Sequence, residues 1–362
     1  MGISPRKTVG AIYNRKLNFW IRTYAMQKAY EGVSVMDEGY PRIVAFTLNH
    51  IGDVLFTEPA ITALRAGYPK ARLIVITSPV ARAVLEQHPD IDELWVRERT
   101  LKGWFKLVIK VTQVRPDITV CFSPSSFGMT IAAWVSGAPK RFGFSYRPYL
   151  SHFFTCAVEF QYNRHIVYDN LELATAAGGK ISRDMPRIFL SDHELENGRH
   201  WLDRQGLLGK PILGCHPFAS TIKRQWELEN WAELLNLAAN KFGASVIVFG
   251  GIRDKNDGEK LANIVGGLNV AGHLSLRQFF SVVSHCQVFI GLDSGPTHAA
   301  AALGTPTVAL YGPETRGPVR ASPLGKNVEV IYGETGSWAG VTLERVMDGL
   351  ERVWQNSKRT AH

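Results

Sequence analysis

The stretch GLDSGPTHAAAALGTPTVALYGP, residues 291–313, sets a cluster of polar side chains between two apolar runs. The residues VFIG around its start predict a buried strand, Ala299 to Leu303 predict a short helix, and TPTVALYG predicts a second buried strand. A strand, a helix and a strand in this order are typical of a parallel sheet that carries helices on its faces. The stretch therefore predicts an α/β fold.

The same alternation continues on both sides of this stretch. In the second half of the chain, strands are predicted at 212–217, 245–251 and 269–272, and helices at 228–241, 257–265 and 275–284. In the first half, strands are predicted at 42–48, 71–77, 93–96 and 118–122, and helices at 80–87, at 101–113 and from NHIGD to Gly67. Residues 140–175 lack this rhythm, so we expect them to form loops and a connection between domains.

A chain of 362 residues exceeds the usual size of one hydrophobic core, which favours two domains. We expect two doubly wound, Rossmann-like domains whose ligand crevices face a central cleft. The predicted parts are an N-terminal extension at 1–40, an N-terminal Rossmann-like domain at 41–175, a C-terminal Rossmann-like domain at 176–345, and a C-terminal helix and tail at 346–362.

Composition narrows the class of protein. The four cysteines are scattered without C-x-x-C spacing, which argues for a reducing compartment and against a structural zinc site. No run approaches the ~18 apolar residues that span a bilayer. We therefore expect a cytoplasmic protein.

The basic charge is concentrated at the N-terminus. Residues 1–30 hold six basic residues and no acidic residue, whereas the whole chain carries a net charge of +9. The spacing of aromatic and apolar residues predicts an amphipathic helix here, and a basic helix of this kind suits an anionic membrane surface. A helix packed on its own domain is the alternative. Nucleic-acid binding is disfavoured because no recognition motif or basic stripe follows in the body of the chain.

Several common signatures are absent. There is no G-x-G-x-x-G after the first predicted strand and no G-x-x-x-x-G-K-[ST], which excludes a standard dinucleotide fingerprint and a Walker loop. HELEN at 193–197 lacks the second histidine of H-E-x-x-H, and GLDSG has one residue too many for a G-x-S-x-G elbow.

The polar cluster Asp293, Ser294, Gly295, Thr297 and His298 lies where a predicted strand ends and a helix of small residues begins. Backbone N–H groups at such a helix start, together with the hydroxyls of Ser294 and Thr297, predict an anion site suited to a diphosphate. A helix cap made by Asp293 or Ser294 is the alternative.

A second loop, HPFASTIKRQW at 216–226, also leaves a predicted strand and precedes a helix. Its donors Ser220, Thr221, Lys223 and Arg224 suit phosphate oxygens. A solvated basic loop is the alternative. Both loops follow strands of the same predicted sheet, which favours a shared phosphate site.

In the first half, NHIGD puts Gly52 and Asp53 just past the first predicted strand. Glycine permits the close approach of a ligand, and Asp53 at the mouth of the cleft suits a general base for a sugar hydroxyl. A helix-capping aspartate is the alternative. A helix N-terminus weakens a carboxylate as a base, and desolvation by Ile51 and Val54 would offset this effect.

Five blocks of the sequence resemble, in order, those of the family 9 glycosyltransferases, which are chiefly ADP-heptose:lipopolysaccharide heptosyltransferases. The blocks are IVAFTLNHIGDVLFTEPAITALRAGYPKARLIVI, HPFASTIKRQWELENWAELL, VIVFGGIRD, LNVAGHLSLRQFF and GLDSGPTHAAAALGTPTVALYGP, and they lie within residues 42–325. The last block is the most specific of the five.

The resemblance implies a GT-B-type fold that holds the nucleotide sugar mainly in its C-terminal domain. It also implies an inverting transfer that requires no metal and no other cofactor. The implied donor is ADP-heptose or a similar nucleotide sugar, and the implied acceptor is the inner core of lipopolysaccharide. The implied location is the cytoplasmic face of the inner membrane, where the enzyme would be peripheral.

The resemblance also implies roles for single residues. Asp53 matches the catalytic aspartate proposed as general base, and Ser220 and Thr221 match the hydroxyls of the phosphate-binding loop. The residues that match the D-[TS]-G-x-x-H motif at the nucleotide sugar are Asp293, Ser294, Gly295 and His298. The family has a basic residue two positions before the loop tryptophan. Here Arg224 matches this residue by spacing and Lys223 matches it by residue type. The resemblance therefore leaves open which of the two binds the phosphate.

Two other functions fit the same architecture. One is a sugar-nucleotide epimerase. The other is a non-catalytic protein that binds a sugar nucleotide and docks on membranes through its basic N-terminal helix. Transfer to a truncated lipopolysaccharide acceptor distinguishes the glycosyltransferase from both.

Overall fold

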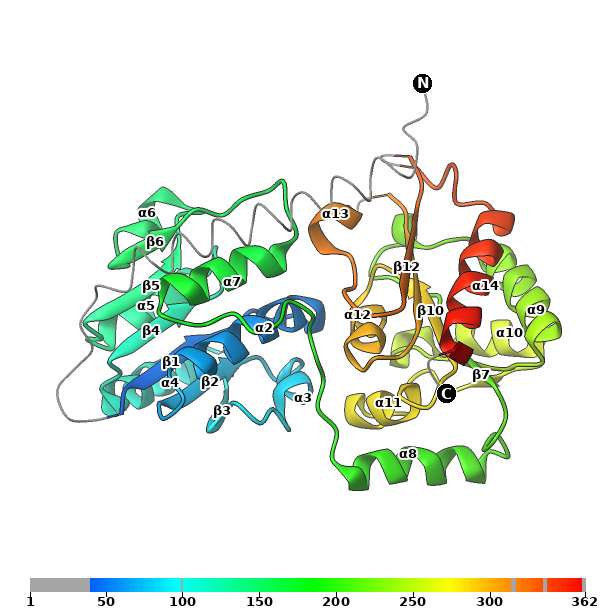
Figure 1. Cartoon of the computed structure of the whole chain (residues 1–362), viewed down its shortest axis with the longest axis horizontal. Helices are drawn as coiled ribbons and strands as arrows, with labels where there is room; N and C mark the ends of the chain where they lie inside the picture. Colours follow the sequence, from blue (N-terminus) through cyan, green and yellow to red (C-terminus); the bar gives the residue numbers. More distant parts are fainter. Residues whose placement is uncertain (1–39, 99, 314–316, 335–336, 360–362) are drawn as a thin grey trace. The chain divides into compact units, whose positions relative to one another are not determined.

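The structure is a computed structural model that describes residues 40–98, 100–313, 317–334 and 337–359. The N-terminal amphipathic helix predicted within residues 1–30 lies outside the described residues. The chain divides into two compact units (Figure 1). Of the described residues, the first unit contains those within 40–82 and 88–184, and the second contains those within 83–87 and 185–359.

The first unit is built on a parallel six-stranded sheet of order β3-β2-β1-β4-β5-β6. Its strands are β1 (Arg42–Phe46), β2 (Arg72–Thr77), β3 (Glu93–Val96), β4 (Ile118–Cys121), β5 (Lys140–Phe144) and β6 (Cys156–Val158). Its helices are α2 (Ile51–Gly67), α4 (Leu101–Val114), α5 (Phe127–Val135), α6 (Pro148–Ser151) and α7 (Ile166–Ala176). The short helix α3 (Arg82–Leu85) spans the division between the units.

The second unit repeats this plan with a parallel sheet of order β12-β11-β10-β7-β8-β9. Its strands are β7 (Ile212–His216), β8 (Ser245–Val248), β9 (Leu268–Asn269), β10 (Val288–Leu292), β11 (Thr307–Tyr311) and β12 (Val328–Tyr332). Its α-helices are α8 (Asp192–Arg204), α9 (Leu228–Phe242), α10 (Lys255–Val265), α11 (Leu276–Val283), α12 (Gly295–Ala302), α13 (Pro318–Ala321) and α14 (Leu343–Arg359). Its 3₁₀ turns are η1 (Ile222–Arg224) and η2 (Ile252–Asp254).

The two sheets have the same connectivity. In each, the chain starts at a central strand, winds outward to one edge, and returns to the other side of the first strand. The strand order therefore reverses between β1 and β4, and again between β7 and β10. Ligands of doubly wound folds bind outside the carboxyl ends of the strands at such a reversal. The prediction of two Rossmann-like domains is confirmed at the level of each sheet.

Local sequence signals predicted several helices and strands correctly. Ser275 and Gln278 form the predicted capping box at the start of α11. Helix α9 ends at Gly243, whose left-handed conformation (φ 62°) terminates the helix without a side-chain clash. The mainly apolar runs became the strands β1, β4, β10 and β11, which are buried except at Arg42, because strands in the middle of a parallel sheet are covered on both faces.

The prediction of loops throughout residues 140–175 is wrong. This segment contains β5, α6, β6 and α7, with β5 paired to β4 and β6 paired to β5. Strand β6 is the edge strand and β5 lies beside it; both are partly exposed, and Lys140 and Arg141 interrupt the apolar pattern of β5. Gly143 leaves room for the ring of Phe154, because a Cβ atom there would lie 2.2 Å from it.

Helix α7 belongs to the first unit, so the division falls after Asp184 and not at the expected position after residue 175. The cause is the packing of α7 against α2, where the side chain of Asn170 donates to the carbonyl of Phe56 (2.9 Å). None of the described helices has the length and apolar character that crossing a membrane requires.

A buried ionic cluster holds the middle of α2. The Glu58 carboxylate is fully buried, accepts a hydrogen bond from Arg183 Nη1 (2.7 Å), and lies 2.7 Å from His88 Nε2. Burial opposes ionisation of Glu58, but hydrogen bonds from Arg183 and His88 outweigh it and lower the pKa of Glu58. A lowered pKa means that this cluster stabilises the fold above the ordinary pKa of Glu58, and that its contribution is lost as pH falls.

We expect Glu58→Ala to lower the free energy of unfolding by about 3–5 kcal/mol, because it leaves the partly buried guanidinium of Arg183 and the buried ring of His88 without their carboxylate. Urea unfolding at pH 7 measures the loss. Glu196→Ala is the matched control: its exposed carboxylate lies 3.2 Å from His200, and we expect a change below about 1 kcal/mol. A similar small loss for Glu58→Ala would contradict the structural role of the cluster.

Candidate functional site

Two of the predicted loops meet at the carboxyl edge of the second sheet. Strand β7 pairs directly with β10, with His216 opposite Gly291. The chain after β7 enters the loop that leads to η1, and the chain after β10 enters Asp293 and the start of α12. The two loops lie about 70 positions apart in the sequence, and they leave neighbouring strands at the reversal of strand order.

Asp293 lies at this edge and contacts residues of both loops. Its backbone N–H donates to the carbonyl of Leu310 (3.0 Å), which fixes it beside β11. Its carboxylate accepts a hydrogen bond from Arg224 Nη2 (2.7 Å) and lies 3.2 Å from His298 Nε2. Burial would raise the pKa of Asp293, but hydrogen bonding by His298, the charge of Arg224 and the hydroxyl of Tyr311 lower it. Asp293 is therefore a stable anion that orients its partners, and it is a poor proton acceptor.

The loop after β7 presents one held cation and one exposed cation. Arg224 Nη2 also donates to the backbone carbonyl of Asp293 (3.0 Å), so the guanidinium is attached to the end of β10. The side chain of Lys223 is exposed, and its backbone carbonyl accepts a bond from Trp338 Nε1 (3.4 Å). Ser220 and Thr221 are exposed in the same loop. The structure thus distinguishes two cations that the sequence pattern left equivalent.

The start of α12 offers fewer donors than its sequence suggests. Thr297 is fully buried, and its hydroxyl donates to the carbonyl of Leu292 (2.6 Å), so this hydroxyl stabilises the loop from inside. The N–H groups of Thr297 and His298 donate to the carbonyl of Ser294. Pro296 has no N–H. Within the described residues, the N–H groups of Ser294 and Gly295 are the ones that remain at this helix end for an anion.

Ser294 occupies the N-cap position of α12, but its side chain makes no capping hydrogen bond. Its hydroxyl lies 3.4 Å from His216 Nδ1 and 3.3 Å from the hydroxyl of Thr297. Gly291 permits this packing, because a Cβ atom there would lie 2.5 Å from the Thr297 hydroxyl. The capping alternative is therefore wrong for the side chain of Ser294, whose hydroxyl faces the end of β7.

Sequence reasoning did not single out His216. It is the last residue of β7, and burial lowers its pKa to about 4, so the imidazole is neutral at pH 7. A neutral imidazole beside Ser294 helps to hold the hydroxyl in place. The signal in the sequence was the His-Pro pair at the end of a predicted strand, which ends the sheet pairing and turns the chain into the loop.

In the first unit, Asp53 lies in the first turn of α2, directly after the β1 loop. The N-cap is His50, so the alternative of a helix-capping aspartate is wrong. Asp53 is buried, with 7% of its surface exposed. The hydroxyl of Thr57 donates to its backbone carbonyl (3.0 Å), and Gly52 precedes it in the same turn. These features fix the backbone of Asp53 in the first turn of α2.

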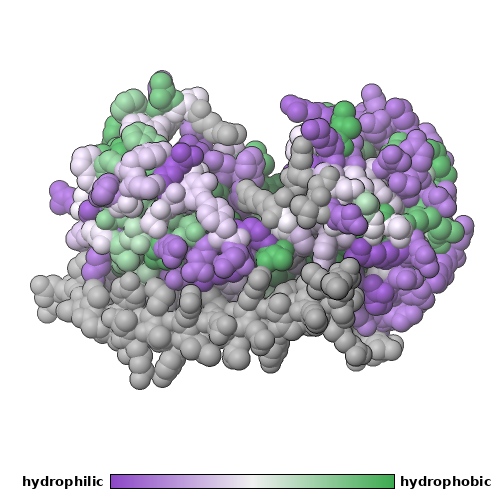
Figure 2. Space-filling view, turned by 90° about the horizontal axis from the view of Figure 1, so that it is seen from above, coloured by the Kyte–Doolittle hydropathy of each residue, from purple (hydrophilic) through white to green (hydrophobic). Residues whose placement is uncertain are grey.

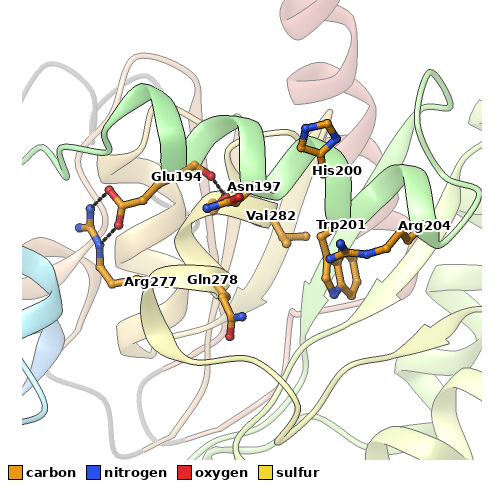
Figure 3. A pocket seen from close by; sticks show the side chains of 10 residues that line it. Glu194, Asn197, His200, Trp201, Arg204, Arg277, Gln278 and Val282 are labelled. Atoms are coloured by element: carbon orange, nitrogen blue, oxygen red, sulfur yellow. Dashed lines mark hydrogen bonds and ion pairs between the residues drawn. The ribbon is translucent and has the colours of Figure 1, made fainter.

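A separate cavity lies between α8 and α11 in the second unit and has a volume of about 420 Å³. Figure 3 shows Glu194 and Arg277 at one end and Trp201 and Arg204 at the other. Arg277 Nε donates to Glu194 (2.6 Å), which with the Ser191 bonds lowers the pKa of Glu194 to about 2. None of the predicted site residues lines this cavity.

The chemistry of these groups is limited and specific. The second unit offers a held guanidinium, helix-end N–H groups and hydroxyls, which suit an anionic ligand such as a diphosphate. The first unit offers the buried carboxylate of Asp53 at the start of α2. Among the described residues, no three or more His, Cys, Asp or Glu side chains form a group that could hold a metal ion.

Comparison with known proteins identifies the family. The sequence profile of "Glycosyltransferase family 9 (heptosyltransferase)" matches residues 113–348. Lipopolysaccharide heptosyltransferase 3 of Escherichia coli is 25% identical over 72% of this chain and 80% of its own length. Lipopolysaccharide heptosyltransferase 2 of Escherichia coli K12 is 26% identical, with 82% and 89% covered.

The fold agrees with that of a solved member of the family. The structure of the Escherichia coli ADP-heptose lps heptosyltransferase II aligns with a TM-score of 0.73 at 23% identity, over 88% of this chain and 99% of that one. The two Rossmann-like units therefore have the GT-B-type fold that the sequence resemblance implied. The profile covers well over half of the chain, and the chain belongs to glycosyltransferase family 9, the heptosyltransferase family.

Proposed function

We propose that this protein transfers a heptose from ADP-heptose, or a related sugar from a similar donor, to the inner core of lipopolysaccharide. The names of its relatives support this donor and this acceptor, and membership of a glycosyltransferase family disfavours both the epimerase and the non-catalytic alternative. The observation that carries the proposal is the bond between Arg224 and Asp293, which keeps a cation at the end of the second sheet.

In this proposal the second unit binds the donor. Asp293 engages one Nη of the Arg224 guanidinium, which leaves other N–H groups of the fork for the diphosphate. The N–H groups of Ser294 and Gly295 and the hydroxyls of Ser220, Thr221 and Ser294 complete the set of donors. Asp293 and Thr297 hold this arrangement from inside, and His298 supports Asp293. Lys223 adds a nearby exposed charge.

In the same proposal Asp53 is the general base of an inverting displacement. It takes the proton of the acceptor hydroxyl as the oxygen attacks the anomeric carbon, and the bond from that carbon to the diphosphate breaks. The held cation and the helix-end N–H groups stabilise the departing ADP. Gly52 allows the acceptor to approach the helix start. Because the acceptor is a membrane lipid, we further propose that the protein is peripheral on the cytoplasmic face of the inner membrane.

We predict that Asp53→Asn lowers the rate of transfer by about 10² to 10⁴-fold, because a positioned base contributes that much. The dissociation constant for ADP, measured by calorimetry, stays unchanged. Release of ADP in the presence of a truncated lipopolysaccharide acceptor gives the rate. Glu98→Gln removes an exposed carboxylate of the same unit and serves as the control. Near-normal turnover of Asp53→Asn would exclude the role of base.

We predict that Arg224→Gln weakens ADP binding by about 10- to 100-fold, because it removes charge-assisted bonds to the diphosphate. Lys223→Gln, its neighbour with an exposed side chain, changes binding less than about threefold. Calorimetric titration with ADP compares the two variants. The reverse order of effects would assign the phosphate cation to Lys223.

A further inference from the structure

Helix α4 carries an apolar face that points away from its own domain. Leu107 and Val111 are buried in the core of the first sheet, and Gly103 is buried against Glu98. On the opposite side, Leu101, Phe105 and Ile109 recur every four residues and are 81%, 59% and 57% exposed. A helix that only covers a sheet has polar residues at these positions. The outer stripe of α4 is therefore unexplained by the packing of the first unit.

The neighbouring helix α5 repeats this pattern. Phe127 and Trp134 lie seven residues apart on one face and are 58% and 50% exposed. The indole N–H of Trp104 in α4 donates to the carbonyl of Gly128 in α5 (2.9 Å), so the two helices lie side by side. Both helices contribute to the same apolar core beneath them. Together their exposed residues form one surface, here called the α4–α5 surface: Leu101, Phe105, Ile109, Phe127 and Trp134.

The charge beside this surface is mainly positive, although Glu98 lies against Gly103 in the first turn of α4 and Glu93 interacts electrostatically with Lys110. Lys102, Lys106 and Lys110 recur along α4 next to the apolar stripe, and α4 contains no acidic residue. From residue 101 to residue 158 the sequence has seven Lys and Arg residues and one acidic residue, Asp117. That carboxylate is bound to Arg42 Nε (3.0 Å). The sequence pattern suggested a basic amphipathic segment only at the N-terminus, whereas the structure adds this second one.

We propose that the α4–α5 surface docks on a bilayer that contains anionic phospholipids. Exposed Phe, Trp, Leu and Ile side chains beside lysines are the composition of helices that lie in the headgroup region, with the apolar side chains inserted and the lysines at the phosphates. On the one face that Figure 2 shows, hydrophobic residues of the described chain lie among hydrophilic ones. An acidic protein partner or a second copy of this chain are the competing occupants that the experiment must separate.

The experiment measures sedimentation of the full chain with two kinds of vesicle, phosphatidylcholine alone and phosphatidylcholine with phosphatidylglycerol. We expect binding only to the anionic vesicles. Lys102→Gln with Lys106→Gln weakens that binding by about 30-fold, since each lysine near the surface contributes about 1 kcal/mol. Phe105→Gln with Ile109→Gln weakens it at least about tenfold. All four side chains are exposed, so the urea unfolding midpoint stays unchanged.

Matched controls lie in the second unit. Leu237→Gln and Lys260→Gln remove one exposed apolar and one exposed basic side chain there, and both leave vesicle binding unchanged. Equal binding of the α4 variants and the wild type overturns the proposal, as does a loss of binding caused only by deletion of residues 1–39. Self-association without lipid that Phe105→Gln with Ile109→Gln abolishes also overturns it. The assay uses neither donor nor acceptor, so its result is independent of the test of sugar transfer.

Discussion

The parallel pairing of β7 with β10 is the constraint on which the candidate donor site depends. Parallel neighbours place their carboxyl ends at the same edge, so whatever follows the two strands is brought together whatever its separation along the chain. Here the pairing joins the loop that carries Arg224 to the turn that carries Asp293, and His216 and Ser294 meet at the same point. The site is a consequence of strand order first and of side-chain chemistry second.

The sequence predicted the parts of the fold in which local and global signals agree. Buried central strands appear in the sequence as short apolar runs, and α11 begins with a complete capping box. Strand β5, next to the edge of the first sheet, lacks such a run, because it is partly exposed and mixes Lys140 and Arg141 with aromatic residues. Its strand character depends on pairing with β4, which is a contact between residues far apart in sequence and leaves no local pattern.

The candidate site likewise has some features that the local sequence predicts and others that depend on packing. The positions of Asp53, Arg224 and the 293–298 turn after strands were predictable, because polar residues that follow apolar runs mark the ends of strands. The direction of each side chain was not. The hydroxyl of Thr297 is turned inward to Leu292, and Arg224 rather than Lys223 is bound to Asp293. Spacing in a loop does not determine which of two adjacent cations folds back onto the sheet, since that choice depends on the surrounding packing.

The bond between Arg224 and Asp293 also bears on what a ligand must do when it arrives. A long side chain that is free in solution loses rotamer freedom when it is immobilised, which costs roughly 0.5–1.5 kcal/mol of binding energy for each such side chain. In this protein the guanidinium is already confined by the end of β10. The entropy of ordering Arg224 is therefore lost when the chain folds, and a nucleotide that reaches the loop keeps that part of its affinity.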